Sequence, residues 1–387
     1  MDYPKIYVNF AAYSSIEKGN LIVRKHGILN IRDFEKLDVG EIVDVYSKKG
    51  RFLGRGFKNP HEIRIVTLKK EKIDENYVRN KIIEADKYRK FLGFKDAYRM
   101  VYTQSDWLNG LVIDKYNDIA TVQIFNYGFE LMKDTIVETL LDLGIDSIYE
   151  KSTGRNRRRA GLKEQEGLLC GEKTETIIKE GNAKFKVTFG GQKTGFFLDQ
   201  RDNRLELEKF IKEGDRVLDV CCYTGGFSVH AALKGAEVVG IDLSKKAVEL
   251  AKENMQLNGI DDSKYEFRVG NAFEIMEEMI EDGEEFDVVI LDPPAFAQSK
   301  KDVKNAVRGY HLLNRYGAKL AKRLLVTCSC SHPIEPMEFK AIVIDAALKA
   351  NKWIRQIGPY RTQPADHPIT SKGTEYLKCL FFKVDGF

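Results

Sequence analysis

The stretch from Arg216 to Asp242, RVLDVCCYTGGFSVHAALKGAEVVGID, constrains the fold of this chain more than any other. An apolar run over 217–222 ends in a Gly-Gly turn, a short helix is expected over 228–233, and a second apolar run closes at Asp242. This order predicts a β-α-β unit whose glycine turn lets the backbone approach a ligand, followed by a carboxylate suited to ribose hydroxyls. The dinucleotide pattern G-x-G-x-x-G is absent, and Asp219 before the turn suits S-adenosylmethionine better than NAD. A purely structural β-α-β turn is the alternative.

The composition is typical of a soluble protein of two or three domains. The 387 residues exceed one ordinary domain, and 43% hydrophobic with 31% charged residues describes a folded chain. No apolar run approaches the ~20 residues needed to cross a bilayer, and MDYPKIYVNF lacks a signal-peptide pattern. Six cysteines without a C-x-x-C pair predict neither a disulfide framework nor a zinc site. We therefore expect a cytoplasmic protein without a metal.

The first 70 residues carry a net positive charge that exceeds that of the whole chain. They hold 14 Lys and Arg against 8 Asp and Glu, although the whole chain has a net charge of only +4. A basic leading segment on a near-neutral body indicates a module that binds a polyanion, with a solvated charged surface as the alternative.

Short β-rich runs separated by glycines fill this segment and predict a small all-β barrel. The runs are 5–10, 21–24, 28–30, 42–46, 52–57 and 63–67. The stretches GEIVDV (40–45) and FLGRG (52–56) resemble the PUA domain, a compact RNA-binding barrel. In that role the phosphates would be contacted by Lys25, His26, Arg51 and Arg55.

Residues 71–180 are expected to form a small α/β domain of their own. A charged helix over 71–93 precedes three strands, with Asn117-Asp118 as a hairpin turn, and an amphipathic helix over 129–143. The basic run GRNRRR, with Arg157, Arg158 and Arg159, lies in an expected loop. This run could contact a phosphate backbone or form a solvated loop.

The stretch FGGQKTGFFLDQRDNR (189–204) crowds glycines, aromatic rings and charges before the β-α-β unit. We interpret it as a ligand lid: Phe196 or Phe197 would cover an adenine or a base, and polar contacts would come from Asp199, Gln200 and Arg201. A plain loop leading into a helix over 203–212 is the alternative.

Beyond Asp242 the chain alternates between apolar strands and helices, which predicts a doubly wound parallel sheet with helices on both faces. Strands are expected at 265–269, 286–291, 323–327 and 377–384, and helices at 244–259, 271–280, 303–322 and 338–350. Ligands of such sheets bind at the carboxyl ends of the strands.

Three predicted strand ends carry polar or reactive residues. Asp219 and Gly225-Gly226 follow the first, Asp292-Pro293-Pro294-Ala295-Phe296 follows FDVVIL, and TCSCSH (327–332) ends the next. The two prolines force a rigid, extended exit. A cysteine at the rim of the pocket can act as a nucleophile when its thiolate is favoured. A buried, inert thiol is the alternative for Cys328 and Cys330, and we expect Cys221 and Cys222 to pack in the core.

These motifs together resemble the class I S-adenosylmethionine-dependent methyltransferases, and more closely the large-subunit ribosomal RNA cytosine-5 methyltransferases of type I. The resemblance rests on DVCCYTGGFS, GID, LDPPAF, VTCSCSH, FGGQKTGFFLDQR and Ala365-Asp366-His367-Pro368, and it runs over essentially the whole chain. It implies an α/β protein with a PUA-like β-barrel (1–70), a small α/β middle domain (71–180) and a Rossmann-like methyltransferase sheet (181–387).

The resemblance also implies a reaction. A cysteine thiolate adds to carbon 6 of cytosine, carbon 5 then attacks the sulfonium methyl group, and a base removes the carbon-5 proton before the thiol leaves. Cys328 would be the nucleophile, with Cys330 as second candidate, and Asp292 would hold the base, which must leave its stack to enter the site. Cofactor contacts are expected from Phe197, Asp199, Gln200, Arg201, Asp219, Tyr223, Gly225, Gly226, Asp242, Asn271 and Asp292.

Two departures from the family pattern leave alternatives open. Many relatives have aspartate where this chain has Asn271, and many cytosine-5 enzymes have a cysteine after the prolines. D-P-P-x-F also looks like the loop of exocyclic-amine methyltransferases, which need no thiol, and a non-catalytic RNA-binding scaffold is a further alternative. The partner expected is RNA, most simply large-subunit ribosomal RNA. The sequence does not decide whether the chain forms a homodimer.

Overall fold

The computed structural model describes residues 3–190 and 195–386. The described residues divide into two compact units, and the chain passes between them several times. The first unit comprises Met1–Ile178, Val187–Leu198 and Ala365–Thr374, and the second comprises Lys179–Lys186, Asp199–Pro364 and Glu375–Phe387. Within the described residues, no helix is both long and apolar enough to span a membrane.

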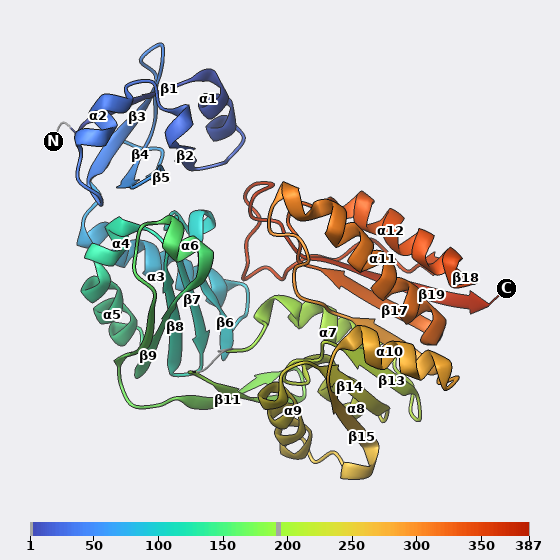
Figure 1. Cartoon of the computed structure of the whole chain (residues 1–387). Coiled ribbons are helices and arrows are strands. Elements are labelled where there is room, and N and C mark those ends of the chain that lie inside the picture. Colours follow the sequence, from blue (N-terminus) through green and yellow to red (C-terminus); the bar gives the residue numbers. More distant parts are fainter. Residues whose placement is uncertain (1–2, 191–194, 387) are drawn as a thin grey trace. The chain divides into compact units, whose positions relative to one another are not determined.

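The first unit begins with a five-stranded sheet of order β1-β3-β4-β5-β2, in which β1 runs parallel to β3 and the other pairs are antiparallel (Figure 1). Its elements are β1 (Lys5–Val8), α1 (Phe10–Glu17), β2 (Ile22–Arg24), α2 (Ile31–Lys36), β3 (Ile42–Ser47), β4 (Phe52–Asn59) and β5 (Glu62–Thr67). The prediction of an all-β segment is wrong, because the segment also contains the helices α1 and α2. Asn9 follows the first strand and caps α1: its side-chain oxygen accepts a hydrogen bond from the Ala12 amide.

A second five-stranded sheet of the same unit has the order β10-β9-β8-β7-β6. The elements are α3 (Glu75–Phe91), β6 (Ala97–Tyr102), β7 (Leu111–Tyr116), β8 (Ile119–Ile124), α4 (Tyr127–Leu131), α5 (Lys133–Asp142), β9 (Ser147–Ser152), α6 (Gly154–Arg159) and β10 (Gln165–Cys170). The hairpin turn lies at Asn117-Asp118 as predicted, with Asn117 at a φ of 56°. The GRNRRR segment is helix α6, so the prediction of a loop there is wrong.

Two short strands, β11 (Glu175–Glu180) and β12 (Ala183–Thr188), pair with each other and were not predicted. After them the chain enters α7 (Arg201–Leu207), a helix that starts and ends earlier than the sequence indicated.

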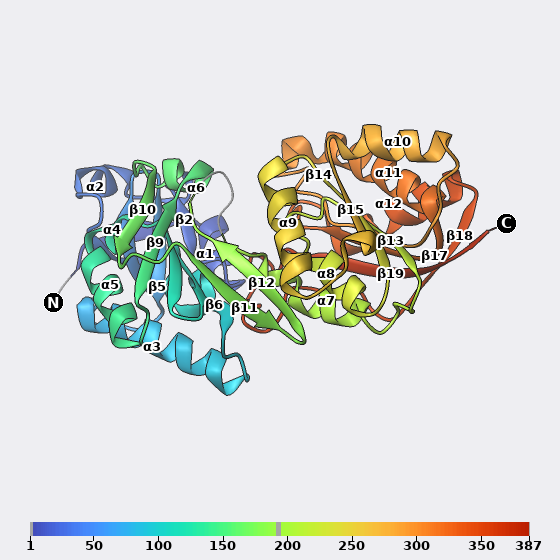
Figure 2. The same cartoon turned by 90° about the horizontal axis from the view of Figure 1, so that it is seen from below.

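The second unit is built on a seven-stranded sheet of order β15-β14-β13-β16-β17-β19-β18. Its elements are β13 (Arg216–Val220), α8 (Gly226–Leu233), β14 (Glu237–Asp242), α9 (Lys245–Leu257), β15 (Tyr265–Val269), α10 (Ala272–Glu281), β16 (Phe286–Leu291), α11 (Val303–Leu320), β17 (Ala321–Ser329), α12 (Pro336–Lys349), β18 (Lys352–Gln356) and β19 (Lys378–Gly386). Helices α10, α11 and α12 cover one face, and α8 and α9 cover the other (Figure 2).

The prediction of a wholly parallel sheet is only partly right. The five strands from β15 to β17 are parallel, but β19 is antiparallel to both β17 and β18. From β13 the chain builds outward through β14 and β15, then returns to β16 on the other side. The strand order therefore reverses between β13 and β16, and this reversal is where open α/β sheets bind ligands.

Candidate active site

The turn after β13 has a backbone that few residues tolerate. Cys221, Tyr223 and Gly225 all have positive φ values, of 65°, 51° and 78°. Left-handed conformations at two residues other than glycine are uncommon and cluster at functional sites. Gly225 caps α8, and a Cβ there would lie 3.2 Å from the Ala251 Cβ, so only glycine fits without displacing α9.

Asp219, at the end of β13, is fully buried beneath this turn. Its Oδ2 accepts a hydrogen bond of 2.6 Å from the Ser228 hydroxyl. Its Oδ1 and the Thr224 hydroxyl have no hydrogen-bond partner among the described residues. Burial raises the pKa of Asp219 to about 6. A buried acceptor without a partner is costly, so a donor from a ligand would satisfy it.

Asp242, at the end of β14, ties the same turn in place. Its Oδ2 accepts from the Tyr223 amide at 3.0 Å, and its Oδ1 accepts from the Ser244 amide at 2.8 Å. Leu243 follows with 76% of its surface exposed, an unusual position for a large apolar side chain. Sequence reasoning did not select Leu243. Asn271 caps α10 through the Phe273 amide, and its side chain is exposed.

Asp292 ends β16 on the other side of the strand reversal. Its Oδ1 accepts a hydrogen bond of 2.8 Å from Nε2 of Gln200, whose own Oε1 accepts from the Asn203 side chain at 2.6 Å. Burial raises the pKa of Asp292 to about 7, and the nearby carboxylates of Asp199 and Asp219 add to the rise. Near neutral pH this carboxyl group is therefore protonated in a large fraction of molecules.

A buried ion-pair network holds the start of α7, the helix that directly follows Gln200. Nε and Nη2 of Arg204 donate to the two oxygens of Glu180 at 2.6 and 2.8 Å, and both side chains are almost fully buried. Nε2 of His230 lies 3.1 Å from the same carboxylate, and Nε of Arg201 lies 3.5 Å from it. Arg201 thus contacts Glu180, a partner that the sequence did not indicate.

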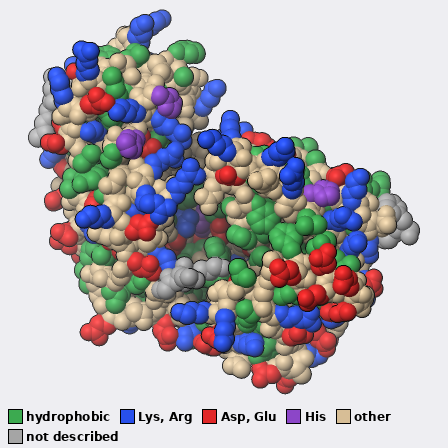
Figure 3. Space-filling view, in the orientation of Figure 1, with side chains coloured by type: hydrophobic (Ala, Val, Ile, Leu, Met, Phe, Trp, Pro, Cys, Tyr) green, Lys and Arg blue, Asp and Glu red, His purple; other side chains and the backbone are tan. Residues whose placement is uncertain are grey.

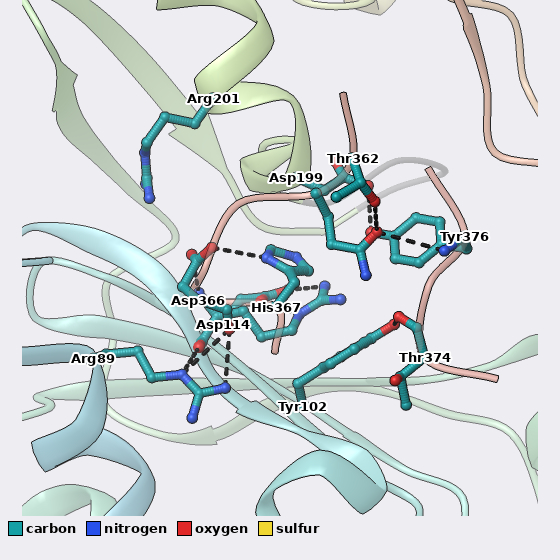
Figure 4. Close-up of polar contacts among 12 residues, drawn as sticks. Arg89, Tyr102, Asp114, Asp199, Arg201, Thr362, Asp366, His367, Thr374 and Tyr376 are labelled. Atoms are coloured by element: carbon teal, nitrogen blue, oxygen red, sulfur yellow. Dashed lines mark hydrogen bonds and ion pairs between the residues drawn. The ribbon is translucent and has the colours of Figure 1, made fainter. Parts of the chain in front are cut away.

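The other predicted lid residues are divided between the units. Phe197 belongs to the first unit, and about half of its surface is exposed. Asp199 belongs to the second, where it accepts a 2.6 Å hydrogen bond from the Tyr376 hydroxyl (Figure 4). Residues 191–194 of the predicted lid lie outside the described part of the chain.

The prediction that Cys328 lies at the pocket rim is wrong. Strand β17 runs to Ser329, two residues further than expected, so Cys328 is a strand residue opposite Cys379 of β19 and fully buried. Burial raises the pKa of the Cys328 thiol well above its usual range. Cys330 follows the end of the strand and is partly exposed, with its sulfur 4.0 Å from the Pro293 carbonyl oxygen. The structure therefore favours Cys330, the second candidate.

Lys378 is a buried lysine that sequence reasoning missed. Only 4% of it is exposed, and its Nζ donates to the carbonyl oxygens of Ser331 at 2.8 Å and Ile334 at 3.1 Å. Burial lowers its pKa to about 8, whereas burial raises the pKa of Cys330 to about 12. The Ser331 hydroxyl also accepts from the Ala297 amide, which joins the loops after β16 and β17.

Two of the predicted RNA contacts are wrong because the side chains are buried. Arg55 forms a two-pronged ion pair with Asp44, and Arg157 pairs with Glu130 at 2.6 Å beneath α6. Both side chains form these pairs inside the first unit. The remaining candidates are exposed: Lys25, His26, Arg51, Arg158 and Arg159. Lys25 and Arg51 lie near Glu35 and Glu17, and Figure 3 shows lysine and arginine side chains scattered over the visible side of the N-terminal part of the chain, among acidic and apolar ones.

The segment with Asp366 and His367 belongs to the first unit, although it comes from the end of the chain (Figure 4). Both side chains are buried. Arg89, also buried, donates to the Asp366 carbonyl oxygen at 2.9 Å, and the Arg99 amide donates to its carboxylate at 3.0 Å. This late motif therefore stabilises the first unit, a placement that its position in the sequence did not indicate.

Comparison with known proteins identifies the domains and the family. A PUA-like domain model matches residues 6–68, and a methyltransferase domain model matches residues 211–346. A putative ribosomal RNA large subunit methyltransferase of Methanocaldococcus jannaschii is 75% identical over 381 residues, which is 98% of this chain and 99% of the relative. Ribosomal RNA large subunit methyltransferase I of Shewanella denitrificans is 38% identical, over 96% of each chain.

Two solved structures share the fold. A putative SAM-dependent methyltransferase from Streptococcus mutans has a TM-score of 0.82 at 23% identity and covers 98% of this chain and all of its own. A putative methyltransferase complexed with SAH has a TM-score of 0.83 at 24% identity, with the same coverage. At this identity the likeness establishes the fold. By its identity to curated relatives over almost its whole length, the chain belongs to the ribosomal RNA large subunit methyltransferase family.

Proposed function

We propose that this protein is an S-adenosylmethionine-dependent methyltransferase of large-subunit ribosomal RNA that methylates carbon 5 of a cytosine through a covalent adduct with Cys330. The observation that carries the proposal is the placement of a partly exposed thiol beside the Asp292-Pro293 loop. Both follow neighbouring parallel strands next to the reversal of strand order, where a ligand is expected. The family membership supports ribosomal RNA as the substrate and the cytoplasm as the compartment.

The residues around the turn after β13 fit the cofactor. The unpaired Oδ1 of Asp219 suits the ammonium group of a methionine moiety, and the glycine at 225 lets a ligand approach the backbone closely. The oriented carboxylate of Asp242 suits ribose hydroxyls, and exposed Leu243 suits the face of an adenine ring. When bound, S-adenosylmethionine supplies an electrophilic methyl group.

The side chains on the other side of the reversal suit the activation of cytosine. The Cys330 thiolate would add to carbon 6, forming a sulfur–carbon bond and making carbon 5 nucleophilic. With a pKa of about 7, the Asp292 carboxyl group can donate its proton to the ring nitrogen of the base as the adduct forms. After methyl transfer a base takes the carbon-5 proton, and the bond to Cys330 breaks to release the thiolate.

Cys330→Ser and Cys328→Ser test this assignment as a matched pair. We expect Cys330→Ser to abolish methylcytidine, measured by mass spectrometry of nucleosides, while calorimetry shows unchanged binding of S-adenosylmethionine. Cys328→Ser should keep substantial activity, because the Cys328 side chain is fully buried within β17. Full activity of Cys330→Ser would refute the covalent mechanism, and absent cofactor binding by the wild type would favour a non-catalytic scaffold.

Methylation of an exocyclic amine is the second candidate, since it needs the Asp-Pro-Pro loop but no thiol. Enzymes of that kind use the aromatic residue after the prolines against the base. Here the Phe296 ring packs against Tyr310, with ring centroids 4.5 Å apart, and is therefore already engaged in the fold. This contact weighs against the amine reaction, and the nucleoside produced would distinguish the two.

A further inference from the structure

Three aromatic rings form a row across the N-terminal sheet. Tyr7 of β1 lies opposite Tyr46 of β3, which in turn lies opposite Phe52 of β4. The ring centroids are 6.0 and 5.6 Å apart. Residues next to them in the strands, such as Val45 and Leu53, point into the hydrophobic core on the other face. The row therefore lies on the face of the sheet opposite to this core.

Lysines surround this row. The Nζ atoms of Lys5 and Lys70 lie 6.0 and 5.7 Å from the Tyr46 ring centroid, and Lys70 also lies 5.4 Å from that of Phe52. Both lysines are exposed, and two more exposed lysines, Lys48 and Lys49, lie in the turn that joins β3 to β4. Tyr7 and Phe52 remain partly exposed. Flexible lysine stems cover the middle ring and can move aside.

We propose that this aromatic row binds an unpaired segment of the RNA substrate, with bases stacked on Tyr7 and Phe52 and phosphates contacted by Lys5 and Lys70. Aromatic side chains on adjacent strands, flanked by positive charge, are how sheets bind single strands without reading sequence. Positive charge on the face matches the polyanion, and paired bases cannot stack on it. The inference rests on RNA being the substrate, but it assigns a surface that the sequence did not indicate.

The test is the affinity of the full chain for labelled RNA, measured by fluorescence anisotropy with oligouridine of about 12 nucleotides and a duplex of similar length. Tyr7→Leu with Phe52→Leu should weaken binding of the single strand about tenfold or more and leave the duplex nearly unchanged. Phe10→Leu is the matched control, because Phe10 is an exposed ring on α1 outside the row. Lys5→Met with Lys70→Met should reduce the salt dependence by a slope of about 1.4.

Equal losses for single strand and duplex, or no loss in the double variant, would overturn the stacking site. If the wild type binds neither RNA, the proposed function itself fails. Unchanged circular dichroism of the Leu variants shows that the sheet is intact. A loss confined to the single strand supports the proposal.

A second and independent observation concerns Lys378. Its Nζ donates to the carbonyl oxygen of Ser331, the residue directly after Cys330, and to that of Ile334. The lysine stands on β19, where it pairs with Ser329 at the end of β17. Its ammonium group thus shapes the backbone that presents the thiol, from a site closed to solvent.

We infer that Lys378 is a positioning residue for Cys330, holding the turn after β17 and supplying the positive charge that favours the thiolate. The carboxylates of Asp292 and Asp199 oppose this thiolate, and those of Glu335 and Glu375 favour the charged lysine. Burial lowers the pKa of Lys378 to about 8, so its charge is present below that pH and lost above it. The inference rests on Cys330 being the nucleophile.

Alkylation of Cys330 by iodoacetamide reports the thiolate without requiring methyl transfer. In this reaction the Cys330 sulfur displaces iodide, and the thiol proton goes to solvent. Fragment mass spectra of the tryptic peptide distinguish alkylation of Cys330 from alkylation of Cys328. Below pH 8, Lys378→Met should slow the alkylation of Cys330 about tenfold for each unit by which removing the lysine charge raises the pKa of Cys330. Above that pH the ratio of wild-type to variant rates should fall toward one. Lys383→Met is the matched control, since Lys383 is exposed on the same strand.

A rate ratio that does not change with pH would show a purely structural role and overturn the charge assignment. If the variant does not fold, the wild type alone gives the answer. The logarithm of its rate should rise with a slope below one near pH 8, where Lys378 loses its proton. A straight line of slope one would refute the inference, whatever the outcome for Cys330→Ser in methylation.

Discussion

Arg204→Met tests whether the buried network beneath α7 stabilises the second unit. The substitution keeps an apolar side chain of similar length but removes both hydrogen bonds to Glu180. Breaking a buried pair leaves an uncompensated charge, at a cost of about 3–5 kcal/mol. Because His230 and Arg201 remain near the carboxylate, we expect a loss of about 3 kcal/mol in the free energy of unfolding.

Urea unfolding followed by tryptophan fluorescence measures this loss in the full chain. The two tryptophans are Trp107, in the first unit, and Trp353, on β18 of the second. Trp107→Phe in every protein compared leaves Trp353 as the reporter of the second unit. Arg355→Met is the matched control: its 2.7 Å pair with Asp385 is exposed, so it should cost at most about 1 kcal/mol.

The pH dependence of the free energy of unfolding provides a second test of the Glu180–Arg204 pair. Burial alone would raise the pKa of Glu180, but Arg204 and His230 outweigh it and hold the pKa well below the ordinary 4.5. A carboxylate with a lowered pKa stabilises the fold above its unfolded-state pKa, and this contribution is lost as the pH falls through the folded-state pKa. The difference between wild type and Arg204→Met should therefore be largest at neutral pH and shrink below about pH 4.5. A loss equal to that of Arg355→Met, or one that is constant with pH, would refute the reasoning.

Three further substitutions follow from single contacts. Gly128→Ala would place a Cβ 2.2 Å from the Phe57 ring and should destabilise the first unit by about 1–3 kcal/mol, measured by urea unfolding with Trp107 as the sole tryptophan. Gly225→Ala, at a φ of 78°, should weaken S-adenosylmethionine binding at least about tenfold in calorimetry, because the turn must change its backbone. We expect kcat/KM of the wild type to fall above pH 7, where Asp292, with a pKa of about 7, loses its proton, and Asp292→Asn should remove this fall. An unchanged profile would exclude Asp292 as the proton donor.

The sequence predicted those parts of the fold whose signal is local. Apolar strands such as β16 and the cap of α9 at Ser244 are visible in a single window of sequence, and both lie where expected. Helix α1 was missed because its start depends on one side chain, Asn9, folding back onto the Ala12 amide. Strand β18, KWIRQ, is only five residues long and its two apolar residues are adjacent, so it lacks the polar–apolar alternation from which a strand can be predicted.

The site residues were harder, since burial depends on partners far along the chain. Arg55 and Arg157 look like RNA contacts in a basic sequence, but each pairs with a carboxylate on another element, Asp44 or Glu130. Whether Cys328 or Cys330 is accessible depends on where β17 ends. Strand ends are the least certain feature of a sequence-based assignment.

The polar groups that hold the fold and those proposed for catalysis form one connected network. Glu180 holds Arg204 of α7, Asn203 beside it donates to Gln200, and Gln200 donates to Asp292. Because each link is directional and at least partly buried, a change in the Glu180–Arg204 pair alters the position of the donor that faces the carboxyl group proposed for catalysis. Arg204→Met should therefore lower kcat by more than its effect on stability explains, even where the protein remains fully folded. The exposed control Arg355→Met should leave kcat unchanged, and equal kcat values for the two variants would show that the network serves stability alone.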